Sequence, residues 1–358
     1  MRKKRCSGRD DRVILRENLK YKLFQEATFM LENQYDGLEL STAMLINAAK
    51  QRGIEVVILD LEDNFIRLKK GDKTEYIKQA TRTSADTYIA PLIMENKEVT
   101  KLVLREQGIR VPAGIMVKSA TEAMAHYQEF RGKDIVVKPK SSNFGIGIVI
   151  HKNLQCEKCY HLAVIQAFTH DTSVLIEEFV PGKEYRFLVI GDAVVGILHR
   201  VPANVVGDGV HTIAELVAQK NQNPLRGKGY VSPLEKLRLD HTELAFLSEQ
   251  DKSIATIPEP GETVYLRENS NISTGGDSID FTDDIIADYK AIAVAAAQAV
   301  GAKICGADII IEDIYKTPDD QNYSIIELNF NPALHIHNYP FVGENRHVDE
   351  KVLDLLGF

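Results

Sequence analysis

The chain has 358 residues, of which 44% are hydrophobic and 26% are charged, and its formal net charge is −8 at pH 7. This length predicts two or three domains whose core needs no disulfide or metal to hold it together. The acidic balance argues against a nucleic-acid partner, because proteins that bind phosphate backbones carry excess positive charge. No apolar stretch is long enough to span a bilayer, and no signal-peptide core follows the charged start, so we expect a cytoplasmic protein without membrane contact.

The first part of the chain combines a helical pattern with a strand. Residues 10–36 have helical periodicity with charges on the outer face. Ser41 is expected to cap a further helix, which Gly53 ends, and the apolar run 54–59 follows as a strand. This helix-then-strand order is typical of α/β sheets, and we place a first domain at 1–95.

The middle of the chain alternates short strands and helices. A helix is expected at 97–108, and a loop rich in Ser, Asn and Gly separates two later strands. The predicted strands are 134–138, 146–150, 174–178, 185–190 and 193–199, and the predicted helix among them is 157–168. This pattern indicates a small α+β lobe at about 115–190, within a second domain at 96–358.

A larger lobe is expected at about 191–358. Its first part, 200–280, is rich in Gly, Pro and Asn, a composition typical of lids and substrate loops. A helix at 283–300 that ends at Gly301 follows, and strands are expected at 304–311 and 323–330.

The two C-terminal strands carry acids in otherwise apolar surroundings. Asp308 lies in one strand, and Glu327 and Asn329 lie in the other, where alternation directs both to the same face. Buried acids are costly unless positive charge meets them. Hard oxygen ligands of this kind suit Mg²⁺, which completes its shell with water and phosphate oxygens. Salt bridges to basic side chains are the alternative that these residues alone leave open.

Two further segments have features of a nucleotide site. Lys138 ends a strand before Lys140 and a loop that includes Gly145 and Gly147, and such glycines let backbone N–H groups approach phosphate. An ordinary hairpin with solvated lysines is the alternative. The other segment is a strand that leads into Glu177, Glu178, Phe179 and Val180, followed by a Pro-Gly turn and Glu184. The backbone of this strand end could bind an adenine edge, and Glu184 could accept hydrogen bonds from ribose hydroxyls. A surface hairpin is the alternative.

Two cysteines have a spacing that serves zinc binding or redox chemistry, Cys156 and Cys159. No second pair at ligand spacing accompanies them, although His151 and His161 lie nearby, and we interpret both cysteines as incidental. The basic run at residues 2–5 is interpreted as a solvated terminus. Sparse cysteine agrees with a reducing compartment.

In their order and combination, these segments resemble the ATP-grasp superfamily, in which ATP lies between two α+β lobes behind an N-terminal α/β pre-ATP-grasp domain. The resemblance implies that Lys97 and Lys138 contact phosphates. It places adenine against residues 177–180, ribose against Glu184, and the metal on Asp308, Glu327 and Asn329.

From about residue 40 onward, the chain resembles the C-terminal glutathione synthetase part of bacterial bifunctional glutamate–cysteine ligase/glutathione synthetases. The segments that carry this resemblance are 88–97, 200–209, 221–229, 267–277 and 329–333. The large ligase region that precedes this part in the family is not in this sequence, which is therefore either a stand-alone synthetase or a piece of a longer chain. Two of the blocks are shared with cyanophycin synthetases, so they indicate an acid–amine ligase rather than one substrate.

The resemblance implies an ATP-dependent ligase that joins γ-glutamylcysteine and glycine through an acyl phosphate, with Mg²⁺, or Mn²⁺ in its place. Arg200 would bind the acyl phosphate or a substrate carboxylate, Asn271 would help a loop to close over it, and Lys138 would offset phosphate charge. His335 and His337 are expected to have a structural or substrate-lobe role. The alternatives are another amide ligase of cyanophycin-synthetase type and a non-catalytic ATP-binding regulatory module. A homodimer is left open.

Overall fold

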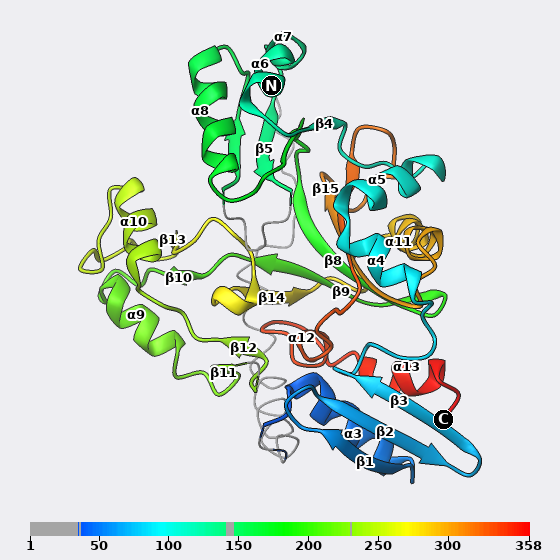
Figure 1. Ribbon diagram of the computed structural model, residues 1–358. Coiled ribbons are helices and arrows are strands. Elements are labelled where there is room, and N and C mark those ends of the chain that lie inside the picture. The colour runs from blue at the N-terminus through cyan, green and yellow to red at the C-terminus, as the bar shows by residue number, and fades with distance from the viewer. Residues whose placement is uncertain (1–34, 36, 141–146, 230) are drawn as a thin grey trace, which may run out of the picture. The chain divides into compact units, whose positions relative to one another are not determined.

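The computed structural model describes residues 35, 37–140, 147–229 and 231–358 (Figure 1). The described residues fall into two compact units, one with residues up to Ala85, Val195–Asp283 and Asn331–Phe358, the other with Asp86–Val194 and Asp284–Phe330. The helix expected at 10–36 lies outside the described residues. The division into domains at residue 95 remains a prediction.

The first unit begins with a helix on a three-stranded antiparallel sheet. Helix α3 (Leu40–Gln51) precedes strands β1 (Glu55–Asp60), β2 (Phe65–Lys70) and β3 (Lys73–Lys78), which pair in that order. The predicted helix-then-strand order is confirmed, although β1 belongs to an antiparallel meander. The C-terminal helix α13 (Val348–Leu355) packs against α3, and the two lie side by side in Figure 1.

The predicted cap of this helix is wrong. Glu39 is the N-cap residue, and Ser41 lies inside the helix and is buried. The Ser41 hydroxyl lies 2.9 Å from Nδ1 of His335 and accepts the Leu334 N–H at 3.1 Å. A serine that resembles a cap in sequence therefore satisfies polar groups nearly 300 residues away.

The rest of the first unit is built from short elements. The helices are α9 (Ile213–Lys220), α10 (His241–Glu249), η1 (Ile272–Thr274) and α12 (His335–Asn338), and the strands are β10 (Asn204–Val206), β11 (Arg226–Gly227), β12 (Leu234–Glu235), β13 (Thr263–Tyr265) and β14 (Asp277–Asp280). Strand β14 pairs antiparallel with β9 (Ala193–Val201), which enters this unit from the other. A core that includes Ile213, Leu247 and Val264 holds α9, α10 and β13 together.

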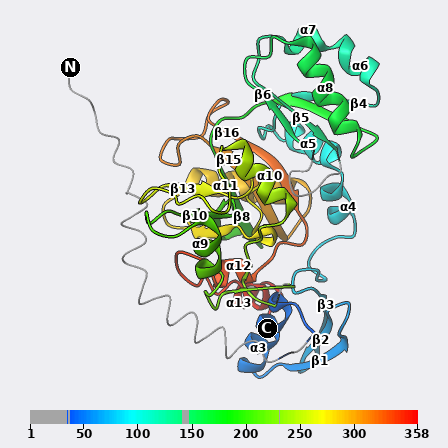
Figure 2. The same ribbon diagram turned by 90° about the vertical axis from the view of Figure 1, so that its left-hand side faces the viewer.

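The second unit contains a four-stranded antiparallel sheet in the order β4-β7-β5-β6. Its strands are β4 (Gly114–Val117), β5 (Ile135–Pro139), β6 (Val149–His151) and β7 (Val174–Glu178). Helices α6 (Ala120–Ala125), α7 (Tyr127–Phe130) and α8 (Glu157–Phe168) lie beside this sheet, as Figure 2 shows. Tyr160 of α8 is fully buried against Val137 and Ile176, so these helices supply the lobe's core.

The same unit has a second antiparallel group of strands, β8 (Lys183–Ile190), β15 (Ile304–Ile311) and β16 (Tyr323–Asn329). Helix α11 (Ala287–Ala299) packs on β8 and β15, and helices α4 (Ile89–Glu95) and α5 (Lys97–Glu106) pack on β16. The predicted bounds of β7, α8 and β15 are confirmed, whereas α4 was not expected. None of the helices in the described part of the chain has the length and apolarity that crossing a bilayer requires.

Candidate nucleotide and metal site

Three charged side chains form a row across adjacent strands of the second unit. Arg186 of β8 is the register partner of Asp308 of β15, and Asp308 is the partner of Glu327 of β16. Register partners project from the same face of a sheet, so the row faces one side. The register of β15 and β16 shifts beyond Asp308, where β16 has an extra residue, Ile326. Such bulges re-aim side chains next to functional sites.

Asp308 is held by a bidentate arginine. Nε of Arg186 donates to Oδ1 of Asp308 and Nη2 donates to Oδ2 at 2.7 Å, and the Asp308 side chain is 2% exposed. Burial works against the guanidinium charge, but the adjacent carboxylate overrides it and raises the pKa of Arg186. The pair is therefore a fixed, buried cation on a carboxylate.

Asn329 completes the group around Asp308. Its Nδ2 donates to the carbonyl of Gly306 and to Oδ2 of Asp308, each at 3.4 Å. Glu327 is more open than Asp308 and is paired with Lys97 at 3.3 Å, with 32% of its side chain exposed. Asp308 and Glu327 thus both form salt bridges with basic side chains in this structure, which is the alternative that the sequence left open for these two acids.

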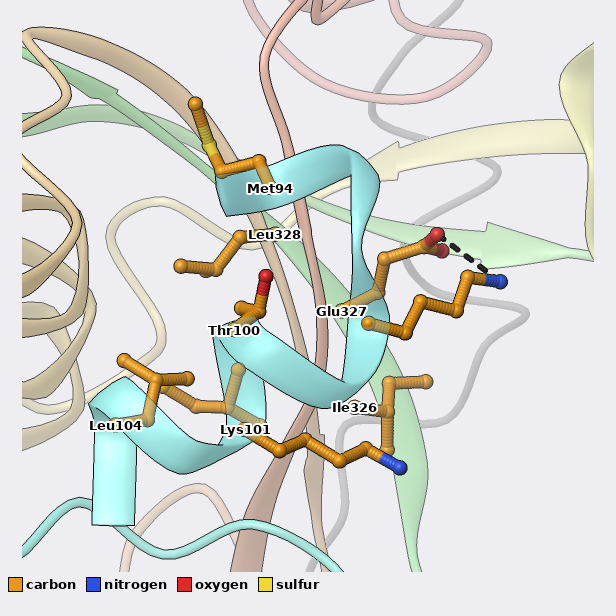
Figure 3. Close-up of a pocket in the computed structure, with 9 residues that line it drawn as sticks. Met94, Thr100, Lys101, Leu104, Ile326, Glu327 and Leu328 are labelled. Carbon is orange, nitrogen blue, oxygen red and sulfur yellow. Dashed lines mark ion pairs between the residues drawn. The ribbon is translucent and has the colours of Figure 1, made fainter. Parts of the chain in front are cut away.

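Lys97 is the first residue of α5, and a small pocket lies between this helix and β16 (Figure 3). The pocket is lined by Met94, Lys97, Thr100, Lys101, Leu104, Ile325, Ile326, Glu327 and Leu328. Figure 3 shows Glu327 directed toward the lysine that pairs with it, and Lys101 extended below the helix toward the same side. Asn96 caps α5 by accepting the Val99 N–H, which fixes the start of the helix and so the position of Lys97.

A second cluster joins α5, β5 and β7 through one carboxylate. Oε1 of Glu177 accepts from Nζ of Lys101, and Oε2 lies 2.7 Å from Nζ of Lys138. Glu177 and Lys101 have side chains that are 5% and 7% exposed. Burial, and then repulsion from Lys138, lower the pKa of Lys101 to about 6. Burial, and then repulsion from Lys97, lower the pKa of Lys138 to about 8.

The segment expected to read adenine continues directly from this cluster. Oε1 of Glu178 accepts from Arg110 at 3.2 Å and from the Ala113 N–H at 3.1 Å. The Phe179 N–H donates to the carbonyl of Asp134 at 2.9 Å, and Val180 is buried. Glu184 is half-buried on β8, two residues before Arg186 and therefore on the same face of the strand.

The phosphate-loop prediction is only in part within the described residues. The Lys140 N–H donates to the carbonyl of Ser173 at 3.0 Å, which ties the end of β5 to the start of β7. Gly147 has φ of 76°, a conformation that glycine adopts without steric cost. Gly145 and the rest of 141–146 lie outside the described residues.

The other predicted catalytic residues, Arg200 and Asn271, belong to the first unit. Arg200 lies on β9 opposite Ser278 of β14. Asn271 is the N-cap of η1, and its carbonyl accepts the N–H of Thr274 at 3.2 Å and of Gly276 at 3.1 Å, which shapes the loop.

A buried arginine supports that loop. Arg226 donates to the carbonyls of Glu235 at 2.7 Å and Gly275 at 3.1 Å and pairs with Asp277, whose second oxygen lies 2.6 Å from Nζ of Lys220. Three segments of the first unit are thus joined at one guanidinium, which keeps the residues after Asn271 in place.

The oxygen donors of the second unit fit a divalent cation. Asp308 and Glu327 supply carboxylates, and Asn329 supplies an amide, from neighbouring positions of two paired strands. Oxygen donors of this kind suit Mg²⁺ or Mn²⁺. Among the described residues, no group of three or more His, Cys, Asp or Glu side chains forms a metal cluster, so any metal here needs the amide or other oxygens as ligands.

Sequence reasoning missed two members of the site, Arg186 and Lys101. Arg186 interrupts an apolar strand as Asp308 does, so the same argument about buried charge would have found it. Lys101 follows Lys97 by four residues, one helical turn, which places both on neighbouring surface positions of α5. Nothing in the sequence indicates that Lys101 reaches Glu177.

The two other motifs have different outcomes. Cys156 and Cys159 are joined as a disulfide, so the interpretation of two incidental cysteines is wrong. His335 is buried, and this burial lowers its pKa to about 4. Its hydrogen bond with Ser41 is a structural contact, as expected for this histidine. His337 is fully buried on the same short helix.

Two family models match parts of the chain. Residues 36–89 match the model of an ATP-grasp-like domain, and residues 94–209 match that of the RimK-like ATP-grasp domain. The chain is 57% identical over 322 residues to the glutathione biosynthesis bifunctional protein GshAB of Clostridium perfringens, and 54% identical over 321 residues to that of Desulfotalea psychrophila. Each match covers 90% of this chain and 41% of the relative.

A solved structure gives the same result. The crystal structure of a bifunctional glutathione synthetase from Pasteurella multocida matches with a TM-score of 0.75 and 46% sequence identity, over 90% of this chain and 44% of that one. The chain thus spans about two fifths of the length of the curated relatives it matches. The chain has the ATP-grasp fold, and along nine tenths of its length it is similar to the glutathione synthetase part of these bifunctional proteins.

Proposed function

We propose that this chain is an ATP-dependent carboxylate–amine ligase that joins γ-glutamylcysteine and glycine to form glutathione. The observation that carries the proposal is the composition of the second unit. Three basic side chains, Lys97, Lys138 and Arg186, belong to the same unit as the oxygen donors Asp308 and Glu327. Lys97 pairs with Glu327, and Arg186 pairs with Asp308. A site for a polyphosphate and its metal needs both kinds of group.

The reaction transfers the γ-phosphoryl group to the acid substrate. The carboxylate of γ-glutamylcysteine attacks the γ-phosphorus of ATP, ADP leaves, and an acyl phosphate forms. The amine of glycine then attacks the acyl carbon, phosphate leaves, and the amide nitrogen loses a proton. The protein's task in such a transfer is mainly positioning and neutralisation of charge.

Each residue has a role in this scheme. Lys97 and Lys138 bind phosphate oxygens, and Arg186, whose Nε and Nη2 are bonded to Asp308, offsets negative charge beside them. ATP-grasp proteins use ATP with a divalent metal ion, and Mg²⁺, or Mn²⁺ in its place, bound by Asp308, Glu327 and Asn329, would neutralise phosphate charge. Glu177 orients Lys138 and, together with Glu178, Phe179 and Val180, reads the adenine edge, while Glu184 accepts ribose hydroxyls.

The first unit would act on the acid and amine substrates. We assign Arg200 to the acyl phosphate or a substrate carboxylate, because a guanidinium keeps its charge and binds carboxylates through two parallel hydrogen bonds. Asn271 lies in a loop with paired glycines that would exclude water from the acyl phosphate. We further propose that the enzyme is cytoplasmic and acts on small molecules, without a nucleic-acid or membrane partner. It would work as a monomer or as a homodimer.

The test is phosphate release by the purified chain with Mg-ATP, γ-glutamylcysteine and glycine, each omitted in turn, with the product identified by mass. Release that needs all three, with a tripeptide product, supports the proposal. Phosphate release only with other acid and amine pairs would support an amide ligase, for example one of cyanophycin-synthetase type. It would contradict the assignment of glutathione as the product. Tight ATP binding without release for any pair supports a regulatory module.

A variant pair tests the site itself. Glu327→Gln keeps the shape of the side chain and removes its charge, so turnover should fall at least a hundredfold, about 2.7 kcal/mol of transition-state stabilisation. Glu312→Gln, in an exposed position directly after the neighbouring strand, should leave turnover unchanged. Equal activity of the two variants would remove Glu327 from the site.

A further inference from the structure

The Cys156–Cys159 pair is the feature of the second unit that the proposed function does not use. Both residues are exposed, and their sulfurs are joined with the Cα atoms 5.1 Å apart, within the usual range for a disulfide. The chain's remaining described cysteine is different: Cys305 is fully buried beside Met94, and burial raises its pKa to about 12. The chain therefore has one accessible sulfur pair and one inert thiol in the described residues.

A metal does not explain the pair. Two cysteine sulfurs provide half of a zinc site, and His151 and His161 lie near them in sequence. In the described ranges, however, no group of three or more His, Cys, Asp or Glu side chains could hold a metal ion. The two sulfurs are also bonded to each other, which leaves neither as a thiolate ligand.

The pair lies at a helix start that favours a thiolate. Cys156 is the N-cap of α8, a helix of 12 residues, and its Sγ accepts the Cys159 N–H at 3.0 Å. Once the disulfide opens, this N–H and the positive end of the helix dipole stabilise negative charge on Cys156. Cys159 lies in the first turn of α8. Among the hydrogen bonds of this turn, no backbone N–H donates to the Cys159 sulfur.

The backbone around the pair is held by other contacts, so opening the disulfide need not unfold the lobe. Leu154 is buried, its N–H donates to the carbonyl of Lys133 at 2.9 Å, and its own carbonyl accepts the Gly132 N–H at 2.7 Å. Tyr160, fully buried one residue after Cys159, donates its hydroxyl to the carbonyl of Ala123 at 3.0 Å. Both sides of the pair are therefore fixed to the core independently of sulfur.

We propose that Cys156 and Cys159 form a reversible dithiol–disulfide site that exchanges with low-molecular-weight thiols, and that Cys156 is its reactive thiolate. This inference does not rest on the proposed ligase activity. A small thiolate attacks Sγ of Cys159, the S–S bond breaks, and Cys156 leaves as the stabilised thiolate. A second small thiolate attacks the small-molecule sulfur of the mixed disulfide and releases Cys159. Two small thiols are oxidised to one disulfide, and their two electrons and two protons reduce the protein pair.

The first test is an equilibrium between the full chain and glutathione. The protein is held without oxygen at pH 7 in mixtures of reduced and oxidised glutathione, quenched with acid, and alkylated with iodoacetamide in denaturant. The expected result is a single transition from no label to two labels on the peptide that contains the pair. Two labels in oxidised glutathione alone, or none in the most reducing mixture, would overturn the proposal.

The second test identifies the reactive sulfur. Cys156→Ser keeps a hydroxyl at the N-cap and retains Cys159, whereas Cys159→Ser retains Cys156. At pH 7 the folded Cys159→Ser variant should be alkylated several-fold faster at its remaining site than Cys156→Ser. Cys305 is the internal control, since it should be labelled only after denaturation. Equal rates at the two sites, in variants with unchanged circular dichroism, would contradict the role given to the helix start.

Discussion

The buried pair between Arg186 and Asp308 leads to a prediction that separates a structural role of Asp308 from a metal-binding role. In Asp308→Asn the side chain keeps its shape, but the guanidinium of Arg186, whose side chain is 10% exposed, loses its counter-charge. Removing one partner of a buried ion pair costs about 3–5 kcal/mol. For a cooperative unit of this size, each kcal/mol lowers the melting temperature by about 2–4 °C, so we expect a drop of roughly 6–20 °C.

Glu327→Gln is the matched control for this experiment. It makes the same chemical change at the neighbouring strand position, but Glu327 is 32% exposed and is paired with Lys97 at 3.3 Å. A partly exposed pair of this kind contributes about 0–1 kcal/mol, so its melting temperature should change by at most about 4 °C. Both variants should lose nucleotide turnover, because both remove a proposed metal ligand.

The assay is thermal unfolding followed by circular dichroism, without nucleotide and with a chelator. If Asp308 were only a metal ligand, its carboxylate would repel Glu327 in the metal-free protein, and Asp308→Asn would be neutral or stabilising. That result, or equal losses in the two variants, would refute the reasoning. An Arg186→Met and Asp308→Leu double variant should regain most of the lost stability, because no charge is then buried alone.

Three further predictions concern the second unit. The folded-state pKa of Lys101 is lowered to about 6, so between this value and the unfolded pKa near 10.5 the unfolded chain holds a proton that the folded chain lacks. The free energy of unfolding should therefore rise with pH in this window, by up to about 1.4 kcal/mol per pH unit. The check is the urea midpoint at pH 6.5 and at pH 8.5, which should rise less in Lys101→Met than in the unmodified chain. Lys138→Met should weaken ATP binding in calorimetry by at least tenfold, about 1.4 kcal/mol, while the far-UV spectrum is kept; unchanged affinity would place the phosphates elsewhere. Gly182 has φ of 132°, and an added Cβ would lie 2.5 Å from the carbonyl oxygen of Ile311. Gly182→Ala should therefore lower the free energy of unfolding in urea by about 1–3 kcal/mol. Gly229→Ala should lower it less, because an added Cβ at Gly229 would have no atom within 4 Å.

Local patterns in the sequence are sufficient for the elements that carry the site. A continuous apolar run gives the strand at 304–311 with the same bounds as in the structure, and helical periodicity gives α8 at 157–168. Each pattern reports how one segment buries its own apolar face, so it can be read without knowledge of the partner. The acids in the strands stand out for the same reason, because a charge in an apolar run is costly wherever the strand lies.

Contacts between distant segments are a different matter. The helix at Leu40 begins before the serine that resembles its cap, because this serine bonds to His335. The charged strands β2 and β3 show only a weak alternation of apolar and polar residues. Their hydrogen-bonded pairing within the meander therefore determines that they are strands. The disulfide at Cys156 depends on side-chain directions at the first turn of α8, which spacing alone leaves open between a metal, a bond and two free thiols.

The sequence by itself determined that Asp308, Glu327 and Asn329 lie on two strands, that Lys97 begins a helix and that Lys138 lies near the end of a strand. Only the tertiary structure decided which basic side chain meets which acid. Arg186 meets Asp308 across 122 residues, and Lys101 meets Glu177 across 76, because strand register and helix packing place them opposite each other. Their ionisation follows from the same packing, since burial removes water from these groups and leaves each charge dependent on its nearest partner.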